Sequence, residues 1–148
     1  MPQKRCVSVY GRGRLLILST SSKTVGRHGL WIEVGPIRVL LKQASPDEVG
    51  RALLDALEDS RDEVPLPHDP ESVQVPLLKA AGVSSWGSFM RGASHIYFER
   101  DSSGIRMIPS EVDGGNFVPV VGLTRHLAES AVDLGNAIKE TVSTLTEK

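Results

Sequence analysis

The first forty residues carry short apolar runs separated by glycines and polar residues, a pattern typical of β-strands. Residues 6–10 and 15–19 form two such runs with a Gly-rich connection between them. Two further runs, residues 30–34 and 37–41, are separated by Gly35-Pro36, which predicts a turn. We therefore expect four short strands in this part of the chain.

The pattern changes to a helical one after Ser45-Pro46-Asp47-Glu48. Ser45 can cap a helix, Pro46 suits the first helical position, and Glu48 completes a capping box. Apolar residues then recur at spacings of three and four, while most charged residues fall off that stripe. The helix should end near Arg61, because the prolines that follow make residues 64–71 an extended loop.

The next segment predicts two short helices followed by a hairpin. Residues 75–81 suit a helix that ends at Gly82 in the left-handed conformation, and Ser84 or Ser85 can cap a second helix. Residues 95–99 and 105–109 alternate around the turn residues 101–104, which indicates a β-hairpin.

The last part of the chain predicts a turn, a strand and a long helix. The turn covers residues 113–116 and the strand covers residues 117–120. Apolar residues recur at helical spacing over residues 125–145, a length sufficient for a helix that packs across a sheet.

Aromatic and aliphatic residues on these elements indicate the core. We assign five of them to it: Trp86, Phe89, Ile96, Phe98 and Phe117. Alternation places Ile96 and Phe98 on one face of the hairpin and His95, Tyr97 and Glu99 on the other. We expect the second face to be a partly exposed sheet surface.

Length and composition fit one domain over residues 1–148, of class α+β, with a mainly antiparallel sheet and helices packed on it. A chain of this size buries roughly two thirds of its unfolded surface. Its apolar runs are too short for a secretion signal or a membrane span, so we expect a cytoplasmic protein. The lone Cys6 cannot form an internal disulfide and is expected to be a buried thiol.

The net charge of −1 conceals two blocks of opposite sign. Residues 1–43 contain eight Lys or Arg and one acid, Glu33, whereas residues 44–75 contain nine acids and two arginines. The two blocks can face each other in the fold, or the acidic block can meet a basic partner.

The sequence carries no motif that predicts a catalytic, metal or cofactor site. His28, His68, His95 and His126 lie far apart, without the spacing that metal ligands need, and no phosphate-binding glycine motif is present. His95 and Tyr97 share a strand face. A small hydrolase or transferase built around them is therefore a further alternative, although no nucleophile and base are paired.

One set of residues resembles a known family. Ser85-Trp86-x-x-Phe89, followed by Ile108-Pro109-Ser110 and Gly114-Gly115-x-Phe117-x-Pro119, is similar to the immunity proteins of bacterial contact-dependent growth inhibition systems (the CdiI family). The resemblance implies a small cytoplasmic protein that catalyses nothing and neutralises the C-terminal toxin domain of a cognate effector, often a nuclease.

A nuclease binds a polyanion in a basic cleft, so its inhibitor needs the opposite potential. We therefore predict that the toxin is met by acids of the second block: Glu58, Asp59, Asp62, Glu63, Asp69 and Glu71. The main alternative is a nucleic-acid-binding module that uses the basic N-terminal strands, with Arg5, Arg12, Arg14, Lys23 and Arg27. Under the first interpretation we expect no membrane and no direct nucleic-acid partner.

Overall fold

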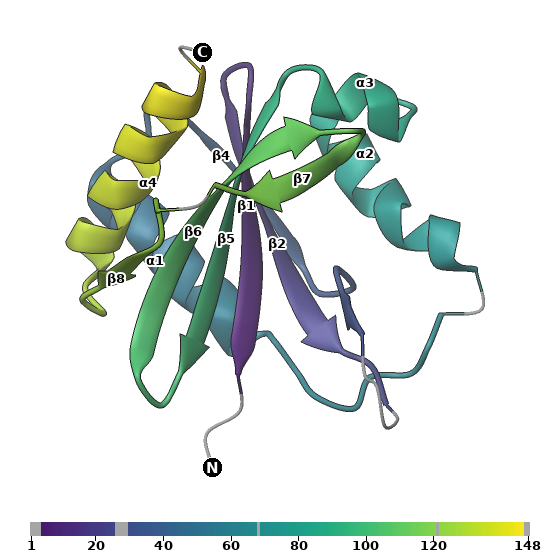
Figure 1. Cartoon of the computed structure of the whole chain (residues 1–148), viewed down its shortest axis with the longest axis horizontal. Helices are drawn as coiled ribbons and strands as arrows, with labels where there is room; N and C mark the ends of the chain where they lie inside the picture. The colour runs from purple at the N-terminus through teal and green to yellow at the C-terminus, as the bar shows by residue number, and fades with distance from the viewer. Residues whose placement is uncertain (1–3, 26–29, 68, 121, 147–148) are drawn as a thin grey trace.

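The computed structural model describes residues 4–25, 30–67, 69–120 and 122–146. A curled sheet of eight strands lies between two sets of helices (Figure 1). The main strand order is β3-β2-β1-β5-β6-β7, and every pair of named strands in the described ranges is antiparallel. The α+β class with a mainly antiparallel sheet is therefore confirmed.

The strands are β1 (Arg5–Arg12), β2 (Leu15–Lys23), β3 (Trp31–Ile32), β4 (Ile37–Leu41), β5 (Ala93–Asp101), β6 (Gly104–Asp113), β7 (Asn116–Pro119) and β8 (Arg125–Leu127). The helices are α1 (Pro46–Glu58), α2 (Val75–Ala81), α3 (Trp86–Met90) and α4 (Ala131–Thr146), with a 3-10 turn, η1 (Pro70–Gln74), before α2.

The predicted helix starts are confirmed where a side chain caps them. Ser45 Oγ accepts a hydrogen bond from Glu48 N at 3.2 Å, and Ser85 Oγ accepts one from Ser88 N at 3.1 Å. Two predicted boundaries are wrong. Helix α1 ends at Glu58 instead of near Arg61, and the C-terminal helix begins only at Ala131, because residues 125–127 pair with β6 as strand β8.

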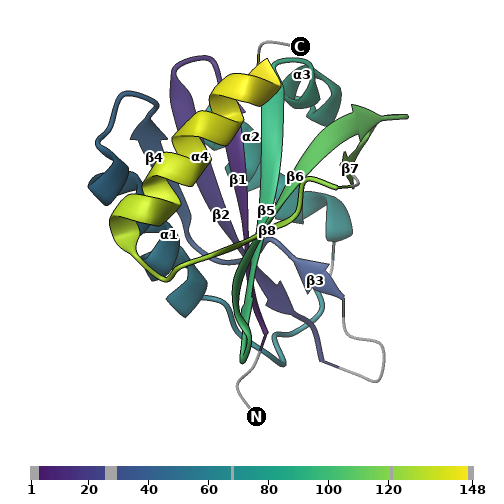
Figure 2. The ribbon, with the colours of Figure 1, turned by 60° about the vertical axis from the view of Figure 1, so that its left-hand side comes forward.

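One face of the sheet packs against α1 and α4, which lie side by side on it (Figure 2). Alternate residues of the four central strands point into this layer and are buried there: Val7, Val9, Leu16, Leu18, Ile96, Phe98, Ile105 and Met107. They meet the apolar stripes of the two helices, such as Leu53 of α1 and Ile138 of α4. This layer is the main hydrophobic core.

Both edges of the sheet divide. Strand β2 pairs with β4 over Leu15–Ser19 and with β3 over Ser22–Lys23, so the two runs around Gly35 follow one strand in succession. At the other edge β6 pairs first with β8 and then with β7. Strands β3 and β7 both contribute residues to the face of the sheet opposite α1 and α4, which we call the second face.

The second face of the sheet is more covered than expected. The surface that we expected to be partly exposed holds His95 and Glu99 in buried positions and Tyr97 in a half-buried one. The predicted core residues all pack in or against a hydrophobic cluster, but the clusters lie on both faces. Ile96 and Phe98 belong to the α1–α4 layer, whereas Phe89 and Trp86 of α3 and Phe117 of β7 pack with Tyr10 on the second face.

Candidate functional site

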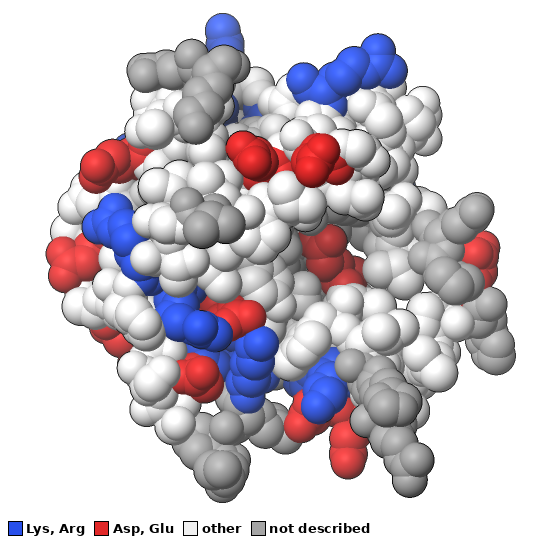
Figure 3. Space-filling view, viewed as in Figure 1, with Lys and Arg blue, Asp and Glu red and all other residues white. Residues whose placement is uncertain are grey.

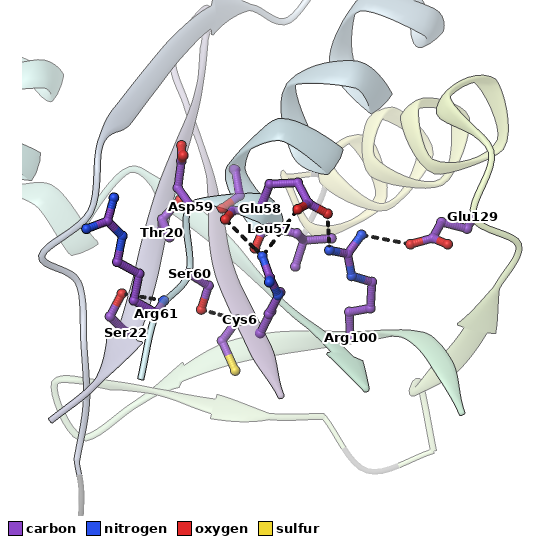
Figure 4. A network of polar contacts seen from close by, with 12 residues as sticks. Cys6, Thr20, Ser22, Leu57, Glu58, Asp59, Ser60, Arg61, Arg100 and Glu129 are labelled. Carbon is purple, nitrogen blue, oxygen red and sulfur yellow. Dashed lines mark hydrogen bonds and ion pairs between the residues drawn. The ribbon is translucent and has the colours of Figure 1, made fainter. Parts of the chain in front are cut away.

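The acidic segment begins at the C-terminal end of α1, where Glu58 is tied into the fold (Figure 4). Its carboxylate accepts a hydrogen bond from Arg5 at 3.3 Å and forms an ion pair with Arg100, which also pairs with Glu129 at 2.8 Å. Hydrogen bonding and charge from Arg100, with the charge of Arg5, lower the pKa of Glu58. Its side chain is nevertheless 63% exposed.

The residues after Glu58 are also held by the sheet. Asp59 forms an ion pair with Arg38 at 2.6 Å. Ser60 Oγ donates to Ser21 O at 2.6 Å and accepts from Cys6 N at 3.1 Å, and Arg61 N donates to Ser22 Oγ at 3.0 Å. The basic and acidic sequence blocks therefore face each other at Glu58 and Asp59, as one of the two interpretations of the charge pattern predicts.

The remaining predicted acids follow in the loop towards η1. Glu63 is exposed and has a positive φ of 58°, Asp62 is half-buried, Asp69 is exposed, and Glu71 lies in η1. Between them the chain pairs with the end of β2 through an isolated bridge from Thr24 to Val64. We call the segment between α1 and η1, residues 59–69, the acidic loop. It leaves the sheet at the end of β2 and leads to the helices on the second face.

The four described basic residues of the alternative interpretation are not gathered in one place. Arg5 and Lys23 lie at one end of the β1–β2 pair, and Arg12 and Arg14 lie at the other. Arg12 comes seven positions after Arg5 along β1, which corresponds to about 23 Å. Arg12 also donates to the main-chain oxygens of α3 at 3.2 and 3.3 Å. Arg27 lies outside the described residues.

A cleft of about 650 Å³ opens on the second face of the sheet. Its floor comes from β1 and β5, and its walls come from β3, β7, α3, η1 and the acidic loop, which contributes Leu66 and Pro67. Figure 3 shows a hollow on this side of the molecule with acidic atoms inside it. The cleft combines polar strand residues with aromatic walls, as ligand sites commonly do.

His95 forms part of the cleft floor and is only 9% exposed. Its Nδ1 lies 3.0 Å from Ser110 Oγ and its Nε2 lies 3.0 Å from Ser8 Oγ, so hydroxyl groups engage both ring nitrogens. Burial lowers the pKa of His95 to about 4. The imidazole is therefore neutral at pH 7, and its ring contacts those of Tyr10 and Phe117, each at a centroid distance of 4.9 Å.

Glu33 also lines the cleft, and the sequence did not single it out as a functional residue. The Tyr10 hydroxyl donates to its carboxylate and lies 3.0 Å from both oxygens. Burial raises the pKa of Glu33, although the nearby Ser19 and Tyr10 hydroxyls partly offset this effect. One signal was available, because Glu33 is the only acid among residues 1–43 and it interrupts an apolar run.

Cys6 is buried, and desolvation raises its thiol pKa to about 11, as suits an unreactive side chain. Within the described ranges, no three His, Cys, Asp or Glu residues are grouped as metal ligands would be. None of the described helices combines the length and apolarity that crossing a bilayer requires.

No protein-family model and no curated protein matches this chain. Its fold is nevertheless shared with solved structures. A protein of unknown function from Neisseria meningitidis superimposes with a TM-score of 0.77 at 19% identity, over 97% of this chain and 96% of the other. A chain of the CdiA-CT/CdiI toxin and immunity complex from Yersinia pseudotuberculosis superimposes with a TM-score of 0.71 at 15% identity, over 95% and 97%. At these identities the likeness establishes a common fold.

Proposed function

We propose that this chain is an immunity protein of a contact-dependent growth inhibition system, which binds the toxin domain of a cognate effector and blocks its activity in the cytoplasm. The observation that carries the proposal is the common fold, over nearly the whole length, with a chain of the Yersinia toxin and immunity complex. The sequence resemblance at α3 and the β6–β7 turn supports the immunity side of such a pair.

A role without catalysis is supported by the state of the candidate acid–base group. His95 is neutral at pH 7, nearly buried, and engaged by a serine hydroxyl at each ring nitrogen. A general acid or base needs a nitrogen within reach of substrate and a pKa near the operating pH. Inhibition by occupying a surface of the toxin needs neither property.

The toxin we propose is a nuclease with a basic active site, met by the acidic surface of residues 58–71. Opposite charge on the two partners would accelerate their encounter, which must precede damage to the cell. Glu58 and Asp59 already form ion pairs within the fold, so we expect Asp62 and Glu63 to supply much of the charge that meets the partner.

Co-expression tests the proposal. The chain is produced together with a tagged toxin domain encoded beside its gene, and both cell survival and co-purification are measured. We expect survival and a stable complex, with neither result for a toxin domain taken from a different system. Death of the co-expressing cells, or failure of the two purified proteins to associate at micromolar concentration, would contradict it.

A further inference from the structure

The Glu33 carboxylate lies in the cleft without an ionic partner among the described residues. The ion pairs in these ranges involve five other acids, and the groups that face Glu33 are neutral hydroxyls: Tyr10 donates to its carboxylate, and the Ser19 hydroxyl lies nearby. Removing a carboxylate from water is unfavourable unless a cation or several donors replace the lost solvation. Glu33 therefore retains acceptor capacity that the fold does not use.

The rest of the cleft suits a cation. Glu33 is the only charged residue in the described lining, and neutral His95 adds no positive charge to repel a cationic group. Trp31, Trp86 and Phe117 contribute aromatic walls. The rings of Trp86 and Phe117 stand nearly perpendicular, at 89° with centroids 6.1 Å apart, and both residues are half-buried, so part of their surface faces the opening.

We propose that this cleft binds a guanidinium group, with Glu33 as its counterion and the aromatic walls as its stacking surface. A guanidinium is planar, donates two parallel hydrogen bonds to a carboxylate, and stacks on aromatic rings. It is also more weakly hydrated than an ammonium group, which favours it in a partly desolvated aromatic cleft. The cavity volume of about 650 Å³ accommodates the group together with the aliphatic stem and flanking atoms.

The lining also indicates which carrier of the guanidinium fits best. Free arginine brings an α-carboxylate, and the described lining offers no cation to pair with it. An arginine side chain within a polypeptide has no such charge. The inference stands on the cleft alone and does not rest on the proposed immunity function.

The protein carries its own reporter for this site, because both of its tryptophans, Trp31 and Trp86, line the cleft. We would titrate the full chain with N-acetyl-arginine-methylamide and follow tryptophan emission, with calorimetry as a second measurement. The matched ligands are the blocked citrulline, a neutral isostere, the blocked lysine, and free L-arginine. We expect saturable binding of blocked arginine and at least tenfold weaker binding of blocked citrulline and blocked lysine.

The matched variants are Glu33→Gln, which removes the charge with little change of shape, and Asp133→Asn, an exposed acid on the opposite helical layer. Binding of blocked arginine should weaken at least tenfold in Glu33→Gln and remain unchanged in Asp133→Asn. If free L-arginine binds as tightly as the blocked form, the cleft is a guanidinium site, but its ligand is a small molecule. Equal binding of citrulline and arginine would overturn the inference without any variant, and so would unchanged affinity in folded Glu33→Gln.

Discussion

Gly50 of α1 lies directly against the backbone of Ala131 at the start of α4. A Cβ built at Gly50 would stand 1.7 Å from Ala131 O, and one at Gly135 would stand 1.7 Å from Pro46 O. Each glycine follows the first residue of its helix by four positions, so the contact is reciprocal. Absence of a side chain at both positions lets the two helix backbones touch, and this fixes the layer that supports the sheet.

Gly50→Ala should therefore lower the free energy of unfolding. The added methyl collides with main-chain atoms, which cannot move aside as a flexible side chain would, and overpacking of this kind costs about 1–3 kcal/mol. Urea unfolding followed by circular dichroism measures the change.

The matched control is Gly87→Ala in α3, where no atom lies within 4 Å of the added Cβ. There the replacement should leave stability unchanged or raise it by about 0.5–1 kcal/mol, because alanine favours a helix. Equal midpoints for the two variants would contradict the assigned close contact.

The buried His95 predicts a loss of stability in mild acid. Its pKa is about 4 in the folded protein against the usual 6.5. Between these values the unfolded chain binds more protons than the folded chain, so stability falls as the pH decreases from about 6.5 to 4. Above pH 6.5 this penalty is absent. At its largest the penalty is roughly 3 kcal/mol, from a shift of between two and three pKa units.

Urea midpoints of the wild-type protein and of His95→Gln, measured from pH 7.5 to 4.5, test this expectation. Carboxyl groups whose pKa is lowered in the folded state, such as Glu58, also lose their stabilising effect as the pH falls. This loss is the same in both proteins and cancels in the difference between them. The wild-type curve should therefore fall more steeply than the curve of the variant. Parallel curves would show that His95 is not desolvated in the folded protein.

Glu33 should behave in the opposite sense. Burial raises its pKa, so the charged form is disfavoured in the folded protein, and stability is lost as the pH rises through the folded pKa. Glu33→Gln removes that charge while leaving an acceptor for the Tyr10 hydroxyl. We expect a higher free energy of unfolding at pH 7 and little difference below the usual glutamate pKa of about 4.3.

A stabilising replacement at a cleft residue is the pattern expected when a destabilising group is kept for function. Comparison of the unfolding free energies of the wild-type protein and Glu33→Gln at pH 7 and pH 4 provides the measurement. If Glu33→Gln is less stable than the wild-type protein at pH 7, the carboxylate stabilises the fold and is not kept for ligand binding.

Arg5 and Glu58 should contribute unequally to stability although they form one ion pair. Arg5 donates to Glu58 O at 2.9 Å and to Leu57 O at 3.4 Å, which satisfies carbonyl groups at the end of α1 as well as the carboxylate. Arg5→Ala should therefore cost about 1–2 kcal/mol. Glu58→Gln, which removes the charge that faces both Arg5 and Arg100, should cost less than about 1 kcal/mol, because the Glu58 side chain is 63% exposed.

Arg14→Ala, in the exposed turn between β1 and β2, provides the neutral control. Thermal unfolding of the three variants would rank them. A cost for Glu58→Gln equal to that of Arg5→Ala would assign the effect to the ion pair instead of the helix end.

The sequence predicted those features that are encoded locally. The Ser45 and Ser85 caps, the Gly82 helix end and the hairpin from β5 to β6 each depend on residues a few positions apart, and the structure contains all of them. The sequence could not show which segments, distant along the chain, pack on the second face. Alternation in β5 places His95 opposite Ile96 but does not reveal that α3, β7 and the acidic loop form walls around it.

The same limit explains why Glu33 was missed and why the sequence could not show which of the predicted acids pair within the fold. A single acid in an apolar run suits an exposed turn as well as a cleft wall, and only the pairing of β3 with β2 places it beside Tyr10. Likewise, the run of charges after residue 57 does not distinguish acids with internal partners, such as Glu58 and Asp59, from acids that face outward.

That distinction gives the most direct test of the proposed acidic toxin-binding surface. Reversing Glu58 or Asp59 to Lys would set a cation against Arg100, Arg5 or Arg38, so a loss of binding could arise from damage to the fold. The pair Asp62→Lys and Glu63→Lys avoids this difficulty, and its cost in stability should stay within about 1 kcal/mol. Asp133→Lys with Glu140→Lys makes the same change of charge on exposed positions of α4.

Calorimetric titration with the cognate toxin domain then separates the two surfaces. We expect the Asp62/Glu63 variant to bind at least tenfold more weakly, with a smaller dependence of affinity on salt, because attraction between opposite charges on the partners is screened by ions. The α4 variant should bind as the wild-type protein does. If the folded Asp62/Glu63 variant retains full affinity while the α4 variant loses it, the toxin contacts the α4 layer, and the acidic loop serves only the fold.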